Sequence, residues 1–264
     1  MLRIVGSLVK YRRFIWKQAV IDLRHRYAGT GMGVAWNVIH PLGIIAIYSI
    51  VFSSIMRISL PNQHGKLAYT LYLCSGFFPW LAFSDCIMRG CNTFVANANY
   101  LKRLAIPEVV FVARSAASTA LSLVINFSLL VVISLILGAS PRWTWALLPL
   151  PLGSLLLLGF SLGFLLGILN VFFRDIAEWA TIVLQIAMWT VPIVYLPELL
   201  PARVRALLPW HPVAPAIAAV REMFFSGTIP QPRWWWGMIG WPVAIFAVAA
   251  LAFGKLAPEM RDAV

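Results

Sequence analysis

Charged side chains are scarce in this sequence. Asp, Glu, Lys and Arg make up only 11% of its 264 residues, whereas a soluble globular domain carries about 25%. Hydrophobic residues account for 61% of the chain, and they form runs long enough to cross a bilayer. This composition excludes an ordinary soluble domain and predicts an integral membrane protein. The runs are too long for the strands of a membrane barrel, so we expect an all-α fold.

Cysteine is also rare. The chain has three cysteines, and their odd number and the absence of a C-x-x-C pair do not fit a disulfide framework: Cys74, Cys86 and Cys91. No group of His, Cys and Asp residues has the spacing of metal ligands. We therefore expect no metal ion and no cofactor in this chain. The cysteines are interpreted as small apolar residues of one membrane helix.

A nucleotide-binding loop is missing as well. The pattern G-x-x-x-x-G-K-[ST] does not occur, since no lysine is followed by Ser or Thr. Because that loop cradles the phosphates of ATP, its absence excludes a self-contained ATPase. Charges inside the apolar runs are few, and Asp85 and Arg89 lie four residues apart, which predicts an ion pair on one helix face. This scarcity argues against an ion-coupled secondary transporter.

Positive charge, by contrast, is in excess, with a net charge of +12 at pH 7. Residues 10–26 interleave Lys and Arg with aromatic and aliphatic residues, which is the pattern of an amphipathic helix in the headgroup layer of a membrane. This placement indicates membrane lipids as partners rather than nucleic acid. We interpret residues 1–33 as a cytoplasmic amphipathic helix region.

The remaining residues, 34–264, are predicted to form a single transmembrane domain. Six apolar segments reach the length of roughly 20 residues that crosses a bilayer, at about 34–56, 68–92, 115–137, 146–170, 177–196 and 234–254. With the N-terminus inside, two-thirds of the 21 Lys and Arg residues fall on the cytoplasmic side, as the positive-inside rule requires. We therefore expect both termini in the cytoplasm.

The predicted outer region between the fifth and sixth spans, residues 197–233, contains seven prolines. The apolar pieces between them are too short to cross a bilayer. Such pieces favour re-entrant helices, because irregular backbone at membrane depth is tolerated where it lines a cavity or is buried in protein. A structured loop that rests on the membrane surface is the alternative.

The fourth predicted span carries glycine at every fourth position, at Gly159, Gly163 and Gly167. Small residues at this spacing allow another helix to approach closely. The sequence leaves open whether that helix belongs to the same chain or to a second copy.

Four segments carry a likeness to a known family, at residues 24–57, 100–110, 170–195 and 211–227. The third contains the run FRDI and ends in Pro-Ile-x-Tyr, which is fairly specific. Together with the chain length and the six-span plan, these segments resemble the membrane subunit of bacterial ABC transporters that export lipid-linked polysaccharides. The chain departs from the family at His40 and His211, where the family favours Asn or another amide before proline. An imidazole can also hydrogen-bond to backbone.

The resemblance implies a half-transporter in the bacterial inner membrane. Two copies would form the pathway, and two separate nucleotide-binding ATPase subunits would supply ATP and Mg²⁺. The expected substrate is undecaprenyl-diphosphate-linked polysaccharide, with O-antigen first and capsular polysaccharide or teichoic acid as alternatives. A membrane enzyme that processes polyprenyl phosphates is a different class, and it would need paired carboxylates or metal ligands. Asp175 with Glu178 is a thin basis for it.

Three groups of functional residues follow. By the resemblance, the residues that couple to the ATPase subunits are Tyr11, Arg12, Arg13, Trp16, Lys17, Tyr100, Leu101, Lys102, Arg103, Arg174 and Asp175. The outer gate would comprise Trp210, His211, Pro212, Arg221 and Glu222. Arg24 and Arg26 are candidate contacts for the lipid diphosphate, and anionic membrane lipids are an equally good alternative ligand for both.

Overall fold

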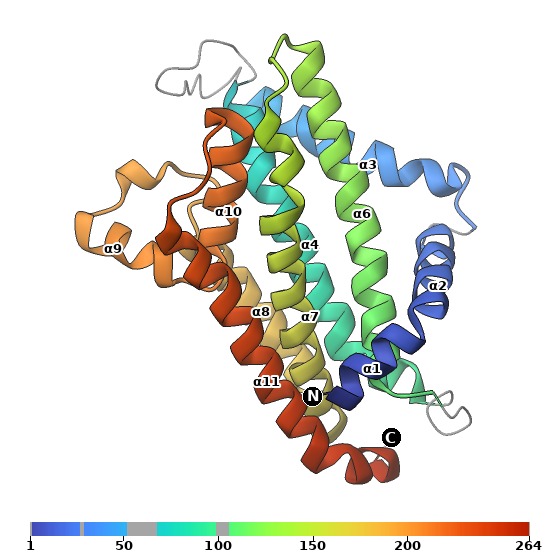
Figure 1. Cartoon of the computed structure of the whole chain (residues 1–264). Helices are drawn as coiled ribbons and strands as arrows, with labels where there is room; N and C mark the ends of the chain where they lie inside the picture. The colour runs from blue at the N-terminus through green and yellow to red at the C-terminus, as the bar shows by residue number, and fades with distance from the viewer. Residues whose placement is uncertain (1, 27–28, 52–67, 99–105, 264) are drawn as a thin grey trace.

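The computed structural model describes residues 2–26, 29–51, 68–98 and 106–263, and all regular structure within these ranges is helical. Figure 1 shows the long helices side by side, with both chain termini at the same end of the bundle. The predicted all-α class is therefore confirmed. A helix satisfies its backbone hydrogen bonds internally, which the hydrocarbon interior of a membrane requires.

Among the described residues, four helical segments are long and apolar enough to cross a membrane. They are α4 (Ala68–Ala96), α6 (Val109–Ile136), Trp143–Phe172, which joins η3 (Trp143–Leu147) to α7 (Pro149–Phe172), and Pro232–Ala257 of α11 (Pro232–Ala263). At 1.5 Å per residue, each exceeds the roughly 30 Å of a hydrocarbon core. The predictions of spans at 68–92, 115–137, 146–170 and 234–254 match these segments. The chain is thus a multi-pass membrane protein with four candidate spans.

The other two predicted spans fall on shorter apolar helices, so the six-span plan stays a prediction. The span predicted at 34–56 contains α3 (Trp36–Tyr48), and its predicted end at 52–56 lies outside the described residues. The span predicted at 177–196 contains α8, which covers only Ile176–Thr190, and the prediction that this helix continues to residue 196 was wrong. Val191 is already extended, with φ −100° and ψ 132°. The cause is Pro192, because a proline disfavours helical conformation in the residue before it.

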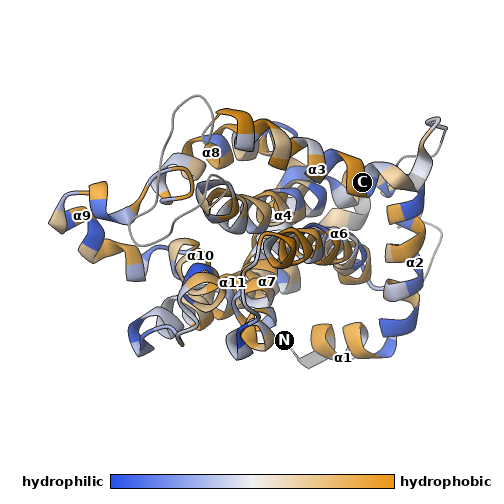
Figure 2. Ribbon diagram, turned by 90° about the horizontal axis from the view of Figure 1, so that it is seen from above, coloured by the Kyte–Doolittle hydropathy of each residue, from blue (hydrophilic) through white to orange (hydrophobic). Residues whose placement is uncertain are grey.

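Helices α4 and α7 approach each other closely at their glycine residues. A Cβ atom built on Gly90 would lie 2.7 Å from the Cα atom of Gly163, and one on Gly167 would lie 2.7 Å from the carbonyl oxygen of Gly90. The helix that the α7 glycines admit is therefore α4 of the same chain. Figure 2 shows α4, α6 and α7 nearly end-on at the centre of the molecule.

The basic N-terminal region forms two helices, α1 (Leu2–Lys10) and α2 (Arg12–His25), which are separated at Tyr11. Both helices pack against α6. Ala19 of α2 is fully buried, whereas Arg13 and Lys17 on the same helix are exposed. The apolar face of α2 is thus covered by the bundle and its basic face is left free. A short helix, η1 (Gly33–Ala35), precedes α3.

Between α8 and α11 the chain forms a series of short helices. They are η4 (Pro197–Leu199), α9 (Ala202–Leu207), η5 (Leu208–Trp210), α10 (Ala214–Arg221) and the π-helix η6 (Glu222–Ser226). Helix α9 projects from the bundle in Figure 1, whereas α10 packs against α4, α7 and α11. Ile217 and Val220 of α10 are almost completely buried. The predicted apolar pieces are therefore helices, and α10 lies inside the protein rather than on its surface.

Candidate functional site

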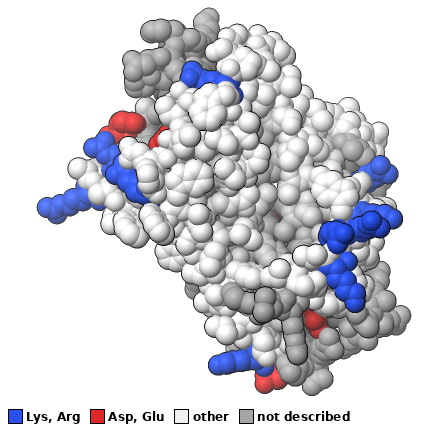
Figure 3. Space-filling model, in the orientation of Figure 1, with Lys and Arg blue, Asp and Glu red and all other residues white. Residues whose placement is uncertain are grey.

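A cavity of about 520 Å³ lies among the short helices that follow α8. We call it the gate cavity, and its walls include Tyr72, Glu198, Arg205, Arg221, Glu222 and Trp234. Its volume falls within the roughly 300–1,000 Å³ that is typical of small-molecule sites. In Figure 3, acidic and basic side chains gather together over α9, while the middle of the same face is uncharged. The gate cavity therefore combines charge with an otherwise apolar surrounding.

Arg221, the last residue of α10, forms one wall of the gate cavity and is only 8% exposed. Its Nη2 donates a hydrogen bond of 2.7 Å to the carbonyl of Ile193, and its Nη1 donates to the carbonyl of Pro192 and, at 2.9 Å, to the Tyr72 hydroxyl. Its guanidinium carbon lies 3.8 Å from the centroid of the Tyr72 ring. Arg221 thus joins α10 to α4 and to the broken end of α8.

The break in α8 explains why an arginine is needed at this position. Residues 191–193 have left the helix, and the carbonyls of Pro192 and Ile193 lie beyond its last turn, where no continuing helix supplies amide partners. A planar guanidinium can satisfy two carbonyls at once and stack on an aromatic ring. The hydroxyl of Tyr69 donates to the carbonyl of Val194 in the same way. A Cβ atom on Gly76 would lie 2.7 Å from Arg221 Nη2, so glycine makes room for the guanidinium on α4.

His211 connects the end of α8 to the start of α10. Its Nδ1 accepts hydrogen bonds from the backbone amides of Val213 at 3.1 Å and Ala214 at 3.2 Å, and its Nε2 lies 3.1 Å from Thr190 Oγ1. The imidazole therefore caps the first turn of α10, as an amide oxygen of Asn would. The prediction that this histidine hydrogen-bonds to backbone is confirmed. Burial lowers the pKa of His211, which favours the neutral ring that this contact requires.

The chain between α8 and α11, which we call the gate segment, is held at η6 by residues in and just before η3. Thr144 Oγ1 donates a hydrogen bond of 2.6 Å to the carbonyl of Met223, and Trp145 Nε1 donates one of 3.1 Å to the carbonyl of Phe224. Arg142 Nη1 donates a hydrogen bond of 2.7 Å to the carbonyl of Ser226. The carbonyls at the end of η6 are thereby satisfied from the loop between α6 and α7.

The residues predicted for the outer gate are only partly brought together. Arg221 and Glu222 both line the gate cavity, and burial raises the pKa of Glu222 while the charge of Arg233 opposes the shift. Trp210 is exposed, and its carbonyl accepts a 2.9 Å hydrogen bond from Trp241 Nε1. Pro212 is half-buried beside His211 in sequence.

Sequence reasoning missed several residues of the gate cavity, namely Tyr72, Glu198, Arg205, Arg233 and Trp234. Tyr72 lies 149 positions before Arg221, and nothing in the pattern of α4 marks it. Arg221, which the resemblance places in the outer gate, is buried. Glu198 was the one residue with a usable signal, because it is one of only two acidic residues in 197–233.

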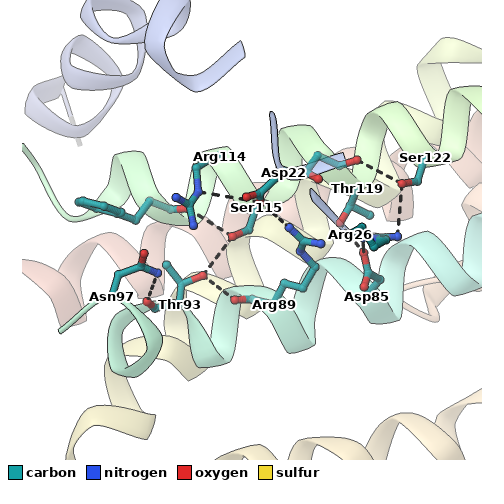
Figure 4. A network of polar contacts seen from close by, with 12 residues as sticks. Asp22, Arg26, Asp85, Arg89, Thr93, Asn97, Arg114, Ser115, Thr119 and Ser122 are labelled. Carbon is teal, nitrogen blue, oxygen red and sulfur yellow. Dashed lines mark hydrogen bonds and ion pairs between the residues drawn. The ribbon is translucent and has the colours of Figure 1, made fainter. Parts of the chain in front are cut away.

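A second cluster of charges joins α2 to the bundle, as Figure 4 shows. Asp22 Oδ2 lies 2.7 Å from Arg89 Nη2 and 4.0 Å from Arg114 Nε. Arg26 Nη2 lies 3.2 Å from Asp85 Oδ2. The expected Asp85–Arg89 pair on α4 is therefore wrong. Each of these residues pairs instead with α2, because Asp22 and Arg26 are also four apart and present the opposite charge at each position.

Polar groups of α6 complete this charge network. Thr119 Oγ1 donates a hydrogen bond of 2.7 Å to Asp85 Oδ2, and Arg26 Nη1 donates one of 3.4 Å to Ser122 Oγ. One step further along α4 and α6, Thr93 Oγ1 and Ser115 Oγ lie 3.2 Å apart. Partly buried charges in an apolar bundle need such partners, because an unsatisfied ion in a low dielectric is costly.

The predicted coupling residues that the structure describes lie mostly on exposed surfaces. Arg12, Arg13, Trp16 and Lys17 are exposed on α2, whereas Tyr11 is half-buried among apolar neighbours. Arg174 and Asp175 are exposed in the turn between α7 and α8. The predicted coupling residues at 100–103 lie outside the described part of the chain.

The two candidate contacts for the lipid diphosphate differ in their surroundings. Arg24 is exposed. Arg26 is held by Asp85 and Ser122. Only Arg24 is therefore free, within the described residues, to take a new anionic partner.

Comparison with known proteins places this helical bundle in a family. The family of ABC-2 type transporters matches residues 15–225. The chain is 27% identical to an O-antigen export system permease protein RfbA of Klebsiella pneumoniae over 210 residues, which cover 79% of this chain and 78% of that protein. A second RfbA protein of Klebsiella pneumoniae is 26% identical over the same share. The RfbA protein of Myxococcus xanthus is 22% identical over the full length of both chains.

The family match covers α4, α6, α7, the broken end of α8 and the whole of α10, and it ends before α11. ABC-2 membrane permeases are the transmembrane subunits of ABC transporters, they carry no ATPase domain, and they work with ATPase subunits. The absence of a nucleotide-binding loop agrees with this assignment. The chain belongs to the ABC-2 type transporter family and is a membrane permease subunit related to O-antigen export permeases.

Proposed function

We propose that this chain is the transmembrane subunit of an ATP-driven exporter that moves undecaprenyl-diphosphate-linked polysaccharide, specifically O-antigen, across the bacterial inner membrane. The observation that carries the proposal is the similarity to three O-antigen export permeases, one of which matches from end to end.

In this proposal the working unit contains two copies of the chain and two ATPase subunits, with both termini in the cytoplasm. The exposed basic face of α2 and the turn at Arg174 and Asp175 form the docking surface for the ATPase. The exposure of these residues supports this role. The charge network then connects the docking surface to α4 and α6, because Asp22 of α2 and Arg26, the residue that follows this helix, pair with residues of those helices.

The chain performs no covalent chemistry in this scheme. Its task is to provide a path for the sugar polymer and to attract the lipid diphosphate at the inner mouth. Arg24 is the better candidate for the diphosphate contact, because Arg26 already has an anionic partner in Asp85. A guanidinium binds phosphate oxygens through paired N–H groups.

The test uses cells from which the gene for this chain has been deleted and in which surface polysaccharide is measured. We expect the chain to restore export together with its ATPase partner, to co-purify with a subunit of ATPase size, and to turn over ATP only when both are present. Failure to restore any surface polysaccharide would contradict the export function. Restoration of a capsule or a teichoic acid, but not of O-antigen, would keep the family and change the substrate.

The diphosphate contact has its own test. Arg24→Glu is expected to reduce export and the stimulation of ATP turnover by the lipid-linked substrate, because it reverses the charge at the inner mouth. Glu259→Lys, a charge reversal at an exposed position near the C-terminus, serves as the control. Unchanged export in the Arg24 variant would remove the diphosphate role.

A further inference from the structure

The gate cavity carries chemistry that transport through the bundle does not by itself require. Aromatic faces, carboxylates and guanidinium groups meet in one space of about 520 Å³. Besides Tyr72 and Arg221, two residues of each kind contribute, namely Phe225 and Trp234, Glu198 and Glu222, and Arg205 and Arg233. Such a mixture is typical of a site that orients a small polar ligand.

Most of these polar groups have no hydrogen-bond or ion-pair partner within the described residues, and the guanidinium carbon of Arg233 lies 5.8 Å from the centroid of the Trp234 ring. Within the described part of the chain, the carboxylates of Glu198 and Glu222 and the guanidinium groups of Arg205 and Arg233 form no hydrogen bond and no ion pair. Opposite charges thus share the cavity without neutralising each other by contact. Their hydrogen-bonding capacity remains available to a ligand.

Arg221 has the opposite role and makes the cavity rigid. Its guanidinium is committed to the carbonyls of Pro192 and Ile193 and to Tyr72, so it fixes one wall of the cavity in place. A fixed wall lowers the cost of binding, because fewer side chains must be ordered when the ligand enters.

The balance of charge distinguishes between ligand classes. Three arginines face two glutamates, and the two carboxylates disfavour a phosphate group in the same space. The hydroxyls of a sugar both donate and accept hydrogen bonds, so they can use carboxylates and guanidinium groups together. The apolar face of a sugar ring can lie on an aromatic side chain such as Trp234.

We propose that the gate cavity binds a saccharide unit of the exported polymer. The proposal rests on the polysaccharide export proposed above and adds a specific contact for the sugar. The contact has to be weak, because a transported ligand must be able to leave each site that it enters. It would hold the polymer in the gate region between ATP cycles.

The test measures binding to the permease–ATPase complex in lipid nanodiscs. The probe is the polysaccharide of the source cells, released from its lipid by mild acid and titrated by calorimetry. Glu198→Gln and Arg205→Ala are each expected to weaken binding about tenfold, since a hydrogen bond to a charged group is lost. Arg203→Ala is the matched control, because Arg203 is an exposed residue of α9 that does not line the cavity.

A second pair of variants tests the aromatic contact without removing charge. Trp234→Phe is expected to weaken binding severalfold, whereas Trp236→Phe, at an exposed position outside the cavity, should leave it unchanged. No binding by the wild-type complex, or equal weakening by the Arg203 and Arg205 variants, would overturn the proposal. Binding of inorganic phosphate that depends on Arg205 and excludes the polysaccharide would overturn it as well.

Export measured in parallel separates this proposal from the proposed function. If the wild-type chain restores surface polysaccharide but the complex binds none of it at the cavity, only the saccharide site fails. If the chain restores no surface polysaccharide, the export function fails, and the saccharide site fails with it.

Discussion

Asp22 on α2 and Arg89 on α4 lie 67 positions apart in sequence, yet Asp22 Oδ2 and Arg89 Nη2 are 2.7 Å apart. The neighbouring pair, Arg26 and Asp85, repeats the contact with the charges exchanged between the helices. Two pairs of this kind fix both the position and the register of α2 on the bundle. Since α2 also carries the exposed basic face, a force applied to that face by a docked partner acts directly on α4.

We expect Asp22→Asn to destabilise the chain. It leaves Arg89 and Arg114, both only partly exposed, without their carboxylate, and the loss should amount to about 1–3 kcal/mol of unfolding free energy. Unfolding by SDS in mixed micelles measures the change. Glu259→Gln is the control, because Glu259 is exposed and forms no ion pair within the described residues. Equal stability of the two variants would contradict a structural role for the pair.

We expect Arg221→Lys to destabilise the gate segment although it preserves the charge. A lysine ammonium cannot donate to the carbonyls of Pro192 and Ile193 and also cover the Tyr72 ring. The loss of charge-assisted hydrogen bonds should cost roughly 1.5–3 kcal/mol. Arg203→Lys on exposed α9 should cost nothing measurable. Limited proteolysis of the chain near residues 191–201, compared between the two variants, would report the loosening at this point, and identical cleavage rates would refute it.

The long apolar helices were predictable from the sequence, because a run of more than 20 apolar residues has few stable alternatives. The end of α8 was not, although Pro192 was visible, because hydropathy continues through Val194 to Leu196 and conceals the break. The ion-pair partners of Asp85 and Arg89 could not be predicted from the sequence either. Their spacing was correct for a mutual pair, and only the packing of α2 decided otherwise.

The same limit applies to the gate cavity. Its residues come from α4, the break after α8, α9, α10 with η6, and the start of α11. No local pattern links these segments, and Tyr72 becomes a partner of Arg221 only after α10 has packed against α4. The outer-gate assignment from family resemblance includes two of the cavity residues, Arg221 and Glu222, but it did not predict the cavity, and the gate role stays a prediction.

We expect Gly90→Ala to separate α4 from α7. The new methyl group would lie 2.7 Å from the Cα atom of Gly163, and backbone cannot yield as a flexible side chain can. Such overpacking should cost about 1–3 kcal/mol. Gly153→Ala is the matched control, since a Cβ on Gly153 meets nothing within 4 Å, and the helix should gain about 0.5–1 kcal/mol there. A Gly90 variant as stable as the Gly153 variant would show that the helices are less closely packed.

The cap that His211 provides should make the stability of the gate segment depend on pH. The pKa of His211 is lowered from 6.5 by burial, so the unfolded chain binds the proton more tightly than the folded chain. The stabilisation is therefore complete above pH 6.5 and is lost as the pH falls from 6.5 through the lower pKa of the folded state. Protonation of Nδ1 also removes the acceptor for the amides of Val213 and Ala214. His211→Asn keeps an acceptor but has no proton to gain, so its thermal midpoint should fall less than that of the wild type over this window. His40→Asn, at an exposed position of α3, should retain the slope of the wild type. A slope as steep as that of the wild type in the His211 variant would assign the pH dependence to another group.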